Sequence, residues 1–277
     1  MENNRAPHRK HYPKLILDLK FTEILKLEEV KVPLTVYIEG NISAGKTELM
    51  KHFKDKPNIA ILTEPLSLWQ DFKGKNLLKL KYENNSKYEY IFQSIANVSR
   101  LEQLNEHSHK NIISIMERSI QSSFNVFVKN SKDNYDMDQL TYEALEYTYE
   151  VLCTRNTLDT VTCPDLYIYL QTSPEVCYER MKKRNREAEE KVELSFLTNI
   201  HEKHERWLNS ENSEEIAKCP ILILDGNVEK EELGKKADIA LGKILKIATE
   251  KQLLKRLFPN GPHPLNQGHV YVVKCDK

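Results

Sequence analysis

The most informative part of this chain is Gly40-Asn41-Ile42-Ser43-Ala44-Gly45-Lys46-Thr47. It matches a P-loop, in which glycines let the turn wrap tightly and the backbone N–H groups point at phosphate oxygens. Lys46 adds a positive charge for the β- and γ-phosphates, and the Thr47 hydroxyl is suited to Mg²⁺. Residues 32–38 before the loop are typical of a buried strand, and residues 48–54 after it are typical of a helix. The stretch therefore predicts a nucleoside-triphosphate site.

The composition fits a soluble enzyme of ordinary size. The 277 residues suffice for one large domain or two small ones, and 41 basic residues balance 41 acidic ones. No bulk charge therefore favours nucleic acid or a membrane. The five cysteines lack CxxC spacing, which indicates reduced thiols instead of disulfides or a zinc site. No apolar run approaches the ~20 residues of a membrane helix. We expect no nucleic-acid partner and no membrane.

Both ends of the chain are polar. Residues 1–31 mix early basic residues with later acidic ones, and transit peptides avoid acids. We therefore expect a flexible N-terminal tail and a cytoplasmic protein, with mitochondrial import as the alternative. Residues 258–277, with three prolines and two glycines, are expected to be a C-terminal tail. The domain that carries the chemistry is predicted at residues 32–257.

Strand-like and helical stretches alternate along this domain. Together with the alternation, the P-loop predicts an α/β fold with a five-stranded parallel sheet flanked by helices. Ligands of such sheets bind beyond the carboxyl ends of the strands. The further strands are expected at 59–63, 112–116, 166–170 and 221–224, the helices at 88–106, 119–129, 137–154, 174–186, 194–209 and 229–256, and a loop at 131–136.

Charged residues follow the second and third predicted strands. Glu64 is placed to act as a general base for a hydroxyl acceptor, or it is a surface glutamate that closes a strand. Trp69 stacks on a planar ring or, taken alone, more simply fills the edge of the core. Arg118 is suited to an oxygen near the transferred phosphoryl group and Glu117 to Mg²⁺, or the two form a charge pair at a helix start.

The predicted helix 88–106 has two distinct faces. Gln93, Ala96 and Arg100 share a polar face, and the opposite face, with Ile91 and Val98, is predicted to be the core side. The polar face is either solvated or lines a pocket. In a pocket, the Gln93 amide would offer a hydrogen-bond donor and an acceptor to a base.

A basic run follows the fourth strand by one helix. It contains Arg180, Arg184 and Arg186 and is followed by acidic residues that include Glu189. Such a run is normally solvated or binds nucleic acid. In a fold that uses a nucleoside triphosphate, it is suited to be an arginine-rich lid that neutralises charge on the transferred group.

These motifs together resemble the deoxynucleoside kinase family. That family includes insect multisubstrate deoxynucleoside kinase, mitochondrial thymidine kinase, deoxycytidine kinase and deoxyguanosine kinase. The resemblance runs from about residue 32 to 225 and agrees in the order and spacing of its motifs. They are the P-loop, Thr63-Glu64-Pro65 with Trp69, Phe92-Gln93, Glu117-Arg118-Ser119, the lid and residues 201–208.

The resemblance implies transfer of the γ-phosphoryl group of ATP to the 5′-hydroxyl of a deoxynucleoside, in nucleotide salvage, by a Mg²⁺-dependent homodimer. It assigns catalysis to Glu64, Arg118, Lys46, Arg184 and Arg186, and the metal to Thr47 and Glu117. ATP would be bound by the P-loop residues 40–47, Arg184, Asp225, Gly226 and Asn227. The deoxynucleoside would be bound by Glu64, Trp69, Tyr82, Phe92, Gln93, Ala96, Arg100, Arg118, Ser123, Phe127 and Glu189.

Base preference is where this chain departs from its family. Members selective for deoxycytidine and deoxyguanosine pair an arginine at position 100 with an aspartate at position 123, but here Arg100 is present and position 123 is a serine, Ser123. A buried arginine without a carboxylate is costly, so Arg100 must find another partner or the base. At the base, it would disfavour thymine and suit cytosine or purines. If it turns to another carboxylate, a thymidine-preferring or multisubstrate enzyme is expected.

Other classes fit less well. A GTPase would need an Asn-Lys-x-Asp motif, which the sequence lacks. A nucleoside monophosphate kinase shares the fold, but Glu64 would repel the phosphate of its acceptor. Oligonucleotide binding by the basic run is opposed by the acidic residues that follow it.

Overall fold

The structure is a computed structural model that describes residues 15–19, 25–107, 113–135, 137–154, 164–217, 219–257 and 271–275. The chain divides into two compact units. One is Pro33–Ile244, and the other joins the two ends, Met1–Val32 and Leu245–Lys277.

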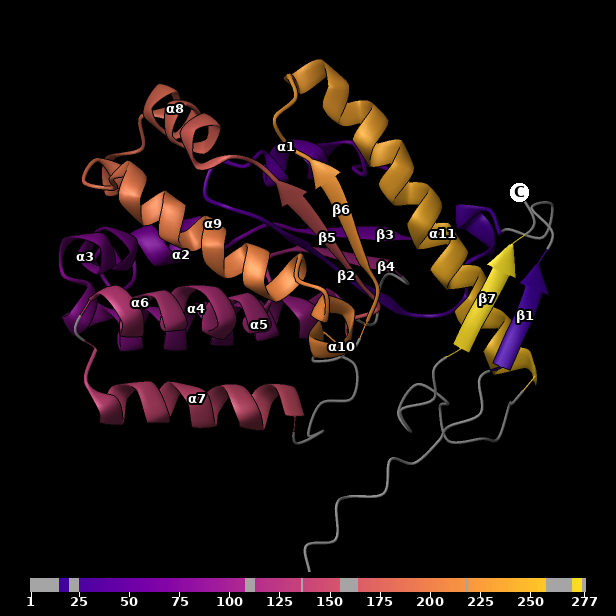
Figure 1. Ribbon diagram of the computed structural model, residues 1–277, viewed down its shortest axis with the longest axis horizontal. Helices are drawn as coiled ribbons and strands as arrows, with labels where there is room; N and C mark the ends of the chain where they lie inside the picture. The colour runs from indigo at the N-terminus through magenta and orange to yellow at the C-terminus, as the bar shows by residue number, and fades with distance from the viewer. Residues whose placement is uncertain are drawn as a thin grey trace, which may run out of the picture. The chain divides into compact units, whose positions relative to one another are not determined.

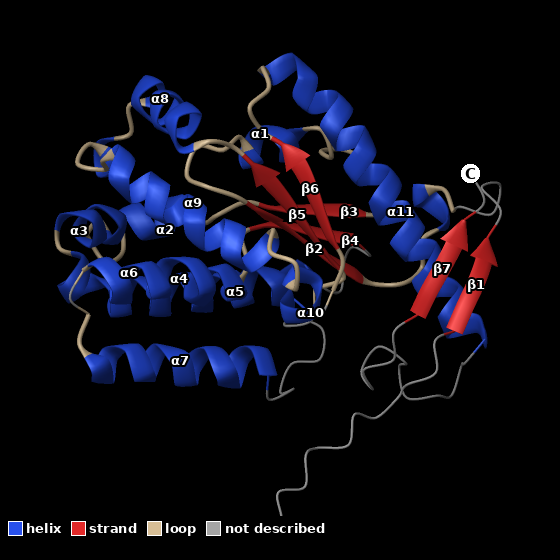
Figure 2. Ribbon diagram, in the orientation of Figure 1, coloured by secondary structure: helices blue, strands red, loops and turns tan. Residues whose placement is uncertain are grey.

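A five-stranded parallel sheet forms the centre of the unit Pro33–Ile244, which confirms the predicted fold class (Figure 2). The strand order is β3-β4-β2-β5-β6, with β2 between β4 and β5. Nearly every residue of β2, β4 and β5 is buried, as expected of a parallel sheet covered on both faces. The bounds are β2 Leu34–Glu39, β3 Ile59–Leu62, β4 Ile113–Glu117, β5 Leu166–Gln171 and β6 Ile221–Asp225.

Helices surround this sheet (Figure 1). They are α1 Lys46–Lys51, α2 Leu66–Gln70, α3 Leu77–Glu83, α4 Asn85–His107, α5 Ile120–Ser122, α6 Lys129–Asn134, α7 Gln139–Thr154, α8 Pro174–Arg184, α9 Leu194–Leu208, α10 Ser213–Ala217 and α11 Leu233–Leu257. Short turns of other helix types are η2 Leu27–Glu29, the π-helix η3 Ser123–Val128, η4 Glu187–Glu189 and η5 Lys230–Glu232.

Aromatic side chains join the sheet to the helices on one face. Tyr37 of β2 stacks on Tyr167 of β5, and Tyr167 meets the ring of Trp207 on α9 edge-on. Tyr169 lies parallel to the imidazole of His204, also on α9. Residues two positions apart in a strand, such as Tyr167 and Tyr169, point to the same face of the sheet. These contacts therefore hold α9 against the centre of the sheet.

The prediction for the faces of α4 was wrong. Gln93 and Arg100 are buried, with exposures of 1% and 4%, whereas Ile91 and Val98 are exposed at 43% and 62%. The polar face is buried because its side chains find hydrogen-bonding partners inside the unit. Periodicity gave the two faces of the helix but not which one points inward.

Other differences concern short elements. Helices α2 and α3 and strands β1 and β7 were not predicted, and residues 131–134, expected in a loop, lie in α6. That last helix continues from α5 through the π-helix, so the polar residues of α6 extend a helix that was already nucleated.

In the second unit, the two ends of the chain pair with each other. Strands β1 Leu15–Leu19 and β7 Tyr271–Cys275 are parallel. Backbone N–H groups of Leu25 and Lys31 donate to side chains of the last turns of α11. The boundaries of the chemical domain at residues 32 and 257 stay a prediction. Within the described residues, no helix combines the length and apolarity needed to cross a membrane.

Candidate active site

A cavity of about 710 Å³ lies at the carboxyl edge of the sheet. Each strand delivers residues to it: Lys46 follows β2, Glu64 follows β3, Glu117 ends β4, Arg184 follows β5 and Asn227 follows β6. This is the location that an open α/β sheet predicts for a ligand.

Most sequence-predicted site residues line the cavity. They are Ile42, Ser43, Gly45, Lys46, Thr47, Glu64, Trp69, Tyr82, Phe92, Gln93, Arg100, Glu117, Arg118, Phe127, Arg184, Arg186, Glu189 and Asn227. Gly40, Asn41, Ala44, Ala96, Ser123, Asp225 and Gly226 are not among its lining residues. We call the part around the P-loop and Glu117 the phosphate end, and the part around Trp69, Lys81, Gln93 and Phe127 the base end.

The P-loop turns tightly at two glycines and binds the Lys46 ammonium with its own backbone carbonyls. Gly40 has φ 144° and Gly45 φ 105°, and a Cβ atom at Gly40 would lie 2.6 Å from the Leu170 carbonyl oxygen. Only glycine fits there. The Lys46 ammonium donates to the carbonyl oxygens of Gly40 and Asn41, at 3.3 and 2.8 Å. The loop therefore holds its own cation at the phosphate end.

Lys46 is buried, and this changes its acidity. Burial, together with the charge of Arg118, lowers the pKa of Lys46 to about 8, although Glu117 and Glu64 act in the opposite direction. Its charge is therefore largely present at neutral pH and is lost as the pH rises through about 8.

Thr47 and Glu117 fit a magnesium ion. The Thr47 hydroxyl lies 3.0 Å from both carboxylate oxygens of Glu117, and Glu117 is buried 4.0 Å from Lys46. Burial and the nearby Glu64 raise the pKa of Glu117. Among the described residues, no group of three or more His, Cys, Asp or Glu could hold a metal alone. Mg²⁺ usually takes one or two carboxylates and completes its shell with phosphates and water, so the two residues suffice.

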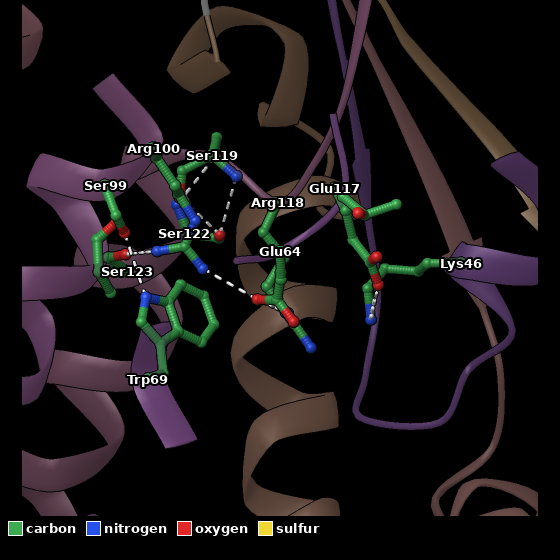
Figure 3. A network of polar contacts seen from close by, with 12 residues as sticks. Lys46, Glu64, Trp69, Ser99, Arg100, Glu117, Arg118, Ser119, Ser122 and Ser123 are labelled. Atoms are coloured by element: carbon green, nitrogen blue, oxygen red, sulfur yellow. Dashed lines mark hydrogen bonds and ion pairs between the residues drawn. The ribbon is translucent and has the colours of Figure 1, made fainter. Parts of the chain in front are cut away.

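Glu64 lies between two arginines (Figure 3). Its Oε1 is 2.9 Å from Nη2 of Arg100 and 3.3 Å from Nε of Arg118. Arg100 also donates from Nη1 to the Ser123 hydroxyl at 3.0 Å and lies over the ring of Trp69. The carboxylate that Arg100 lacks at position 123 is thus replaced by Glu64.

This arrangement controls the ionisation of Glu64. Burial alone would raise its pKa, but the charges of Arg118, Arg100 and Lys46 outweigh burial and hold the pKa of Glu64 below its usual value. The carboxylate is therefore ionised at neutral pH and can accept a proton.

Arg118 is held in an unusual backbone conformation. Its φ is 63°, in the left-handed region, and its N–H donates to the Ile38 carbonyl at 3.0 Å. The next residue, Ser119, donates its N–H and hydroxyl to Oε1 of the buried Glu39, at 2.8 and 2.6 Å. Glu39 therefore ties the turn at Arg118 to the strand that precedes the P-loop. The sequence analysis missed Glu39, although its place directly before Gly40 was visible.

Aromatic rings form the walls of the base end. Trp69 and Phe92 meet edge-on with centroids 5.4 Å apart, and the Trp69 N–H donates to the Ser99 hydroxyl. Ala96 packs in the same apolar cluster and lies behind the wall. Lys81, which was also missed, is buried among these rings and lines the cavity.

The arginine-rich run contributes Arg180, Arg184, Arg186 and Glu189 to the lining of the cavity, and its role as a lid stays a prediction. Arg184 and Arg186 both donate to the buried Glu189, at 2.6 and 2.9 Å. Arg180 instead donates to the carbonyl oxygens of Ala44, Gly226 and Val228. It therefore joins the P-loop to the 225–228 loop, a role the sequence analysis did not assign.

The loop after β6 is held in place by hydrogen bonds among its own residues and by tight packing. Asp225 accepts hydrogen bonds from the backbone and side-chain nitrogens of Asn227, and Gly226 packs so tightly that a Cβ atom would lie 2.0 Å from Thr172 Oγ1. Only Asn227 of the three reaches the cavity.

Comparisons with known proteins agree with this geometry. Residues 36–241 match the model of the family described as "Deoxynucleoside kinase". Human mitochondrial thymidine kinase 2 is 33% identical over 210 residues, which are 75% of this chain and 76% of that protein. A probable deoxycytidine kinase of fowlpox virus is 36% identical over 211 residues, or 76% and 84% of the two chains. Chicken deoxycytidine kinase 2 is 30% identical over 220 residues, or 69% and 82%.

Proposed function

Because this chain belongs to the deoxynucleoside kinase family, we propose that it phosphorylates the 5′-hydroxyl of 2′-deoxynucleosides, with Glu64 as the general base. The chain is an ATP-dependent deoxynucleoside kinase. The observation that carries the proposal is a partly buried, ionised carboxylate in the same cavity as a P-loop.

The proposed reaction follows from the charges around the cavity. The acceptor hydroxyl lies between Glu64 and Arg118, gives its proton to Glu64 and attacks the γ-phosphorus, while ADP leaves toward the P-loop. Lys46 and the lid arginines Arg184 and Arg186 stabilise the negative charge that spreads over the transferred group. Nη1 of Arg118 has no hydrogen-bond partner among the described residues, so it is available for a substrate oxygen.

We propose that Thr47 and Glu117 hold Mg²⁺ with the phosphates of ATP. The ion supplies charge neutralisation at the β- and γ-phosphates. The buried Glu117 carboxylate lies 4.0 Å from the Lys46 ammonium, so we expect it to orient the Lys46 side chain as well.

The base preference is a finer proposal. The sequence suggested that Arg100 favours deoxycytidine and purine deoxynucleosides over thymidine. Its contacts with Glu64 and Ser123 give Arg100 partners other than the base, so this residue alone favours neither that preference nor the alternative of a thymidine-preferring or multisubstrate pocket. The names of the relatives include both thymidine and deoxycytidine kinases.

A homodimer is the proposed assembly. Exposed apolar side chains on α4 (Tyr90, Ile91 and Val98) and on α7 (Leu140 and Tyr147) support it, because contiguous apolar surface often marks an interface. The molar mass in solution tests this. The cytoplasm is the proposed location, and the name of the human relative supports the mitochondrial alternative.

The substitution Glu64→Gln tests the function. Glutamine keeps the shape of the side chain but cannot take the proton, and general-base assistance contributes about 10²–10⁴-fold. We expect kcat to fall by that factor while calorimetry shows nearly unchanged binding of deoxynucleoside. The exposed Glu102→Gln is the matched control. A Glu64→Gln enzyme with more than about a third of the wild-type kcat would refute the assignment.

A further inference from the structure

A buried ion pair lies in the wall of the base end. Lys81 and Glu89 are exposed by 1% and 0%, and their charged atoms are 3.5 Å apart. The Lys81 ammonium also lies over the rings of Phe127, Phe92 and Tyr82, at 4.6, 5.1 and 5.4 Å from their centroids. A planar base that stacks between these rings would therefore meet this cation.

Burial makes a purely structural role a poor explanation. Two charges taken out of water cost more free energy than a well-packed apolar pair of similar size would. Lys81 lines the cavity, and two of the rings around it, Phe92 and Phe127, belong to the base end. A cation retained at such a place is suited to recognise a ligand.

Glu89 also fixes the orientation of Gln93. Gln93 Nε2 lies 2.8 Å from Glu89 Oε1, while the Lys81 ammonium lies beside Glu89 Oε2. An ionised carboxylate only accepts hydrogen bonds, so the Gln93 carboxamide must turn its –NH₂ group toward Glu89. Its Oε1, on the other branch of the planar carboxamide, is then the atom that does not face Glu89. The carboxamide cannot flip without leaving Nε2 unpaired.

The result is an ordered row of polar groups at the base end. Lys81 comes first and only donates, the second N–H of Gln93 comes next and donates, and Oε1 of Gln93 comes last and accepts. The complementary base presents acceptor, acceptor and donor in that order. Cytosine does so with O2, N3 and its 4-amino group, and adenine matches the last two positions with N1 and its 6-amino group.

We propose that Lys81 and Glu89 are specificity residues that select cytosine, and next adenine, over thymine and guanine. Lys81 contacts the base, and Glu89 is a positioning residue that acts through Lys81 and Gln93. Thymine and uracil present acceptor, donor and acceptor, so their N3–H meets a donor and their O4 meets an acceptor. Guanine presents donor, donor and acceptor and fails at all three positions. The inference rests on the proposed function, since it concerns the acceptor of the same reaction.

Four deoxynucleosides test the inference on the wild-type protein. 5-Methyldeoxycytidine has the cytosine edge with the thymine methyl group, and deoxyuridine has the thymine edge without it. We expect deoxycytidine and 5-methyldeoxycytidine to have similar kcat/KM, about 10²-fold above deoxyuridine and thymidine, because a mismatched site leaves polar groups unpaired. The inference would be overturned if kcat/KM depended on the presence of the 5-methyl group instead of on the base edge, or if thymidine were the preferred substrate.

Variants then locate the effect. Removing one charge would leave the other buried and unpaired, so the double variant Lys81→Met/Glu89→Gln is used. We expect its ratio of kcat/KM for deoxycytidine to deoxyuridine to fall at least about tenfold, while kcat changes little. The exposed Lys87→Met on α4 should leave the ratio unchanged. An unchanged ratio in a folded double variant would also overturn the inference.

The two levels of the hypothesis fail differently. If no deoxynucleoside is phosphorylated, the proposed function fails. If deoxynucleosides are phosphorylated but without discrimination between the cytosine and uracil edges, only the role of Lys81 and Glu89 fails. The wild-type series needs no mutant, so instability of the double variant does not leave the inference untested.

Discussion

The two ends of the cavity are built by different kinds of contact. At the phosphate end, Lys46 is held by carbonyl oxygens of residues five and six positions away, inside one loop. At the base end, Arg100 joins Glu64 and Ser123, which are 36 and 23 positions away. A local motif therefore specifies the P-loop part of the phosphate end, whereas Arg100 depends on side chains that meet only in the folded chain, as does Glu117 beside the P-loop.

After the substitution of Glu64, the largest effect is expected at the phosphate end. Lys46→Met removes a preorganised cation, and loss of one such group costs about 10²–10³-fold in kcat. Because the two ends are built separately, we expect the dissociation constant of deoxynucleoside to change by less than about threefold. Steady-state kinetics and calorimetry measure the two quantities.

The exposed Lys51→Met on α1 is the control for Lys46→Met. If loss of Lys46 weakened deoxynucleoside binding as strongly as it lowered turnover, the phosphate end and the base end would form one coupled site. The two ends would then not be independent of each other.

A smaller effect is expected at the lid. Arg184 and Arg186 share Glu189, so either alone keeps that carboxylate paired. We expect Arg184→Ala to lower kcat about tenfold, or by ~1.4 kcal/mol, with little change in the KM of deoxynucleoside, because its charge acts on the transition state. The exposed Lys182→Ala serves as the control. A rise in KM at unchanged kcat would place Arg184 at substrate binding instead.

The smallest effect is expected from Arg100→Met. The Arg100 charge helps to lower the pKa of Glu64, so its removal should raise that pKa. Glu64 must be ionised to accept the proton, and the acid limb of kcat/KM should therefore move to higher pH. We expect less than about a threefold change in the ratio of thymidine to deoxycytidine at pH 7.5.

A pH profile of Arg100→Met decides between its two roles. An unmoved acid limb together with a strong gain for thymidine would mean that Arg100 contacts the base, as the sequence first suggested.

The same contrast explains what could be predicted from the sequence. Strand–loop–helix order and the P-loop spacing are local, so the first strand of the sheet and the position of Lys46 followed from residues 32–54. The position of Glu64 followed because a strand precedes it. Its two arginine partners did not follow, because ion pairs between distant segments leave no periodic signal.

Helix α4 shows most clearly what could not be predicted from the sequence. Hydrophobic periodicity assigns the apolar face to the core, yet here Gln93 and Arg100 are buried and Val98 is exposed. The polar face points inward because the cavity of the candidate active site lies beneath it. Lys81 was missed for a related reason: one lysine in a short helix gives no sign that its ammonium is enclosed by rings.

The buried P-loop lysine also has a thermodynamic consequence for ATP binding. With the pKa of Lys46 at about 8, roughly half of the free protein lacks this proton at pH 8. The phosphates of ATP favour the charged form, so binding must draw a fraction of a proton from the buffer. The apparent enthalpy of binding then includes the ionisation heat of that buffer. Titrations in two buffers of different ionisation enthalpy would differ in measured heat at pH 8 and converge near pH 6, where Lys46 already carries its proton.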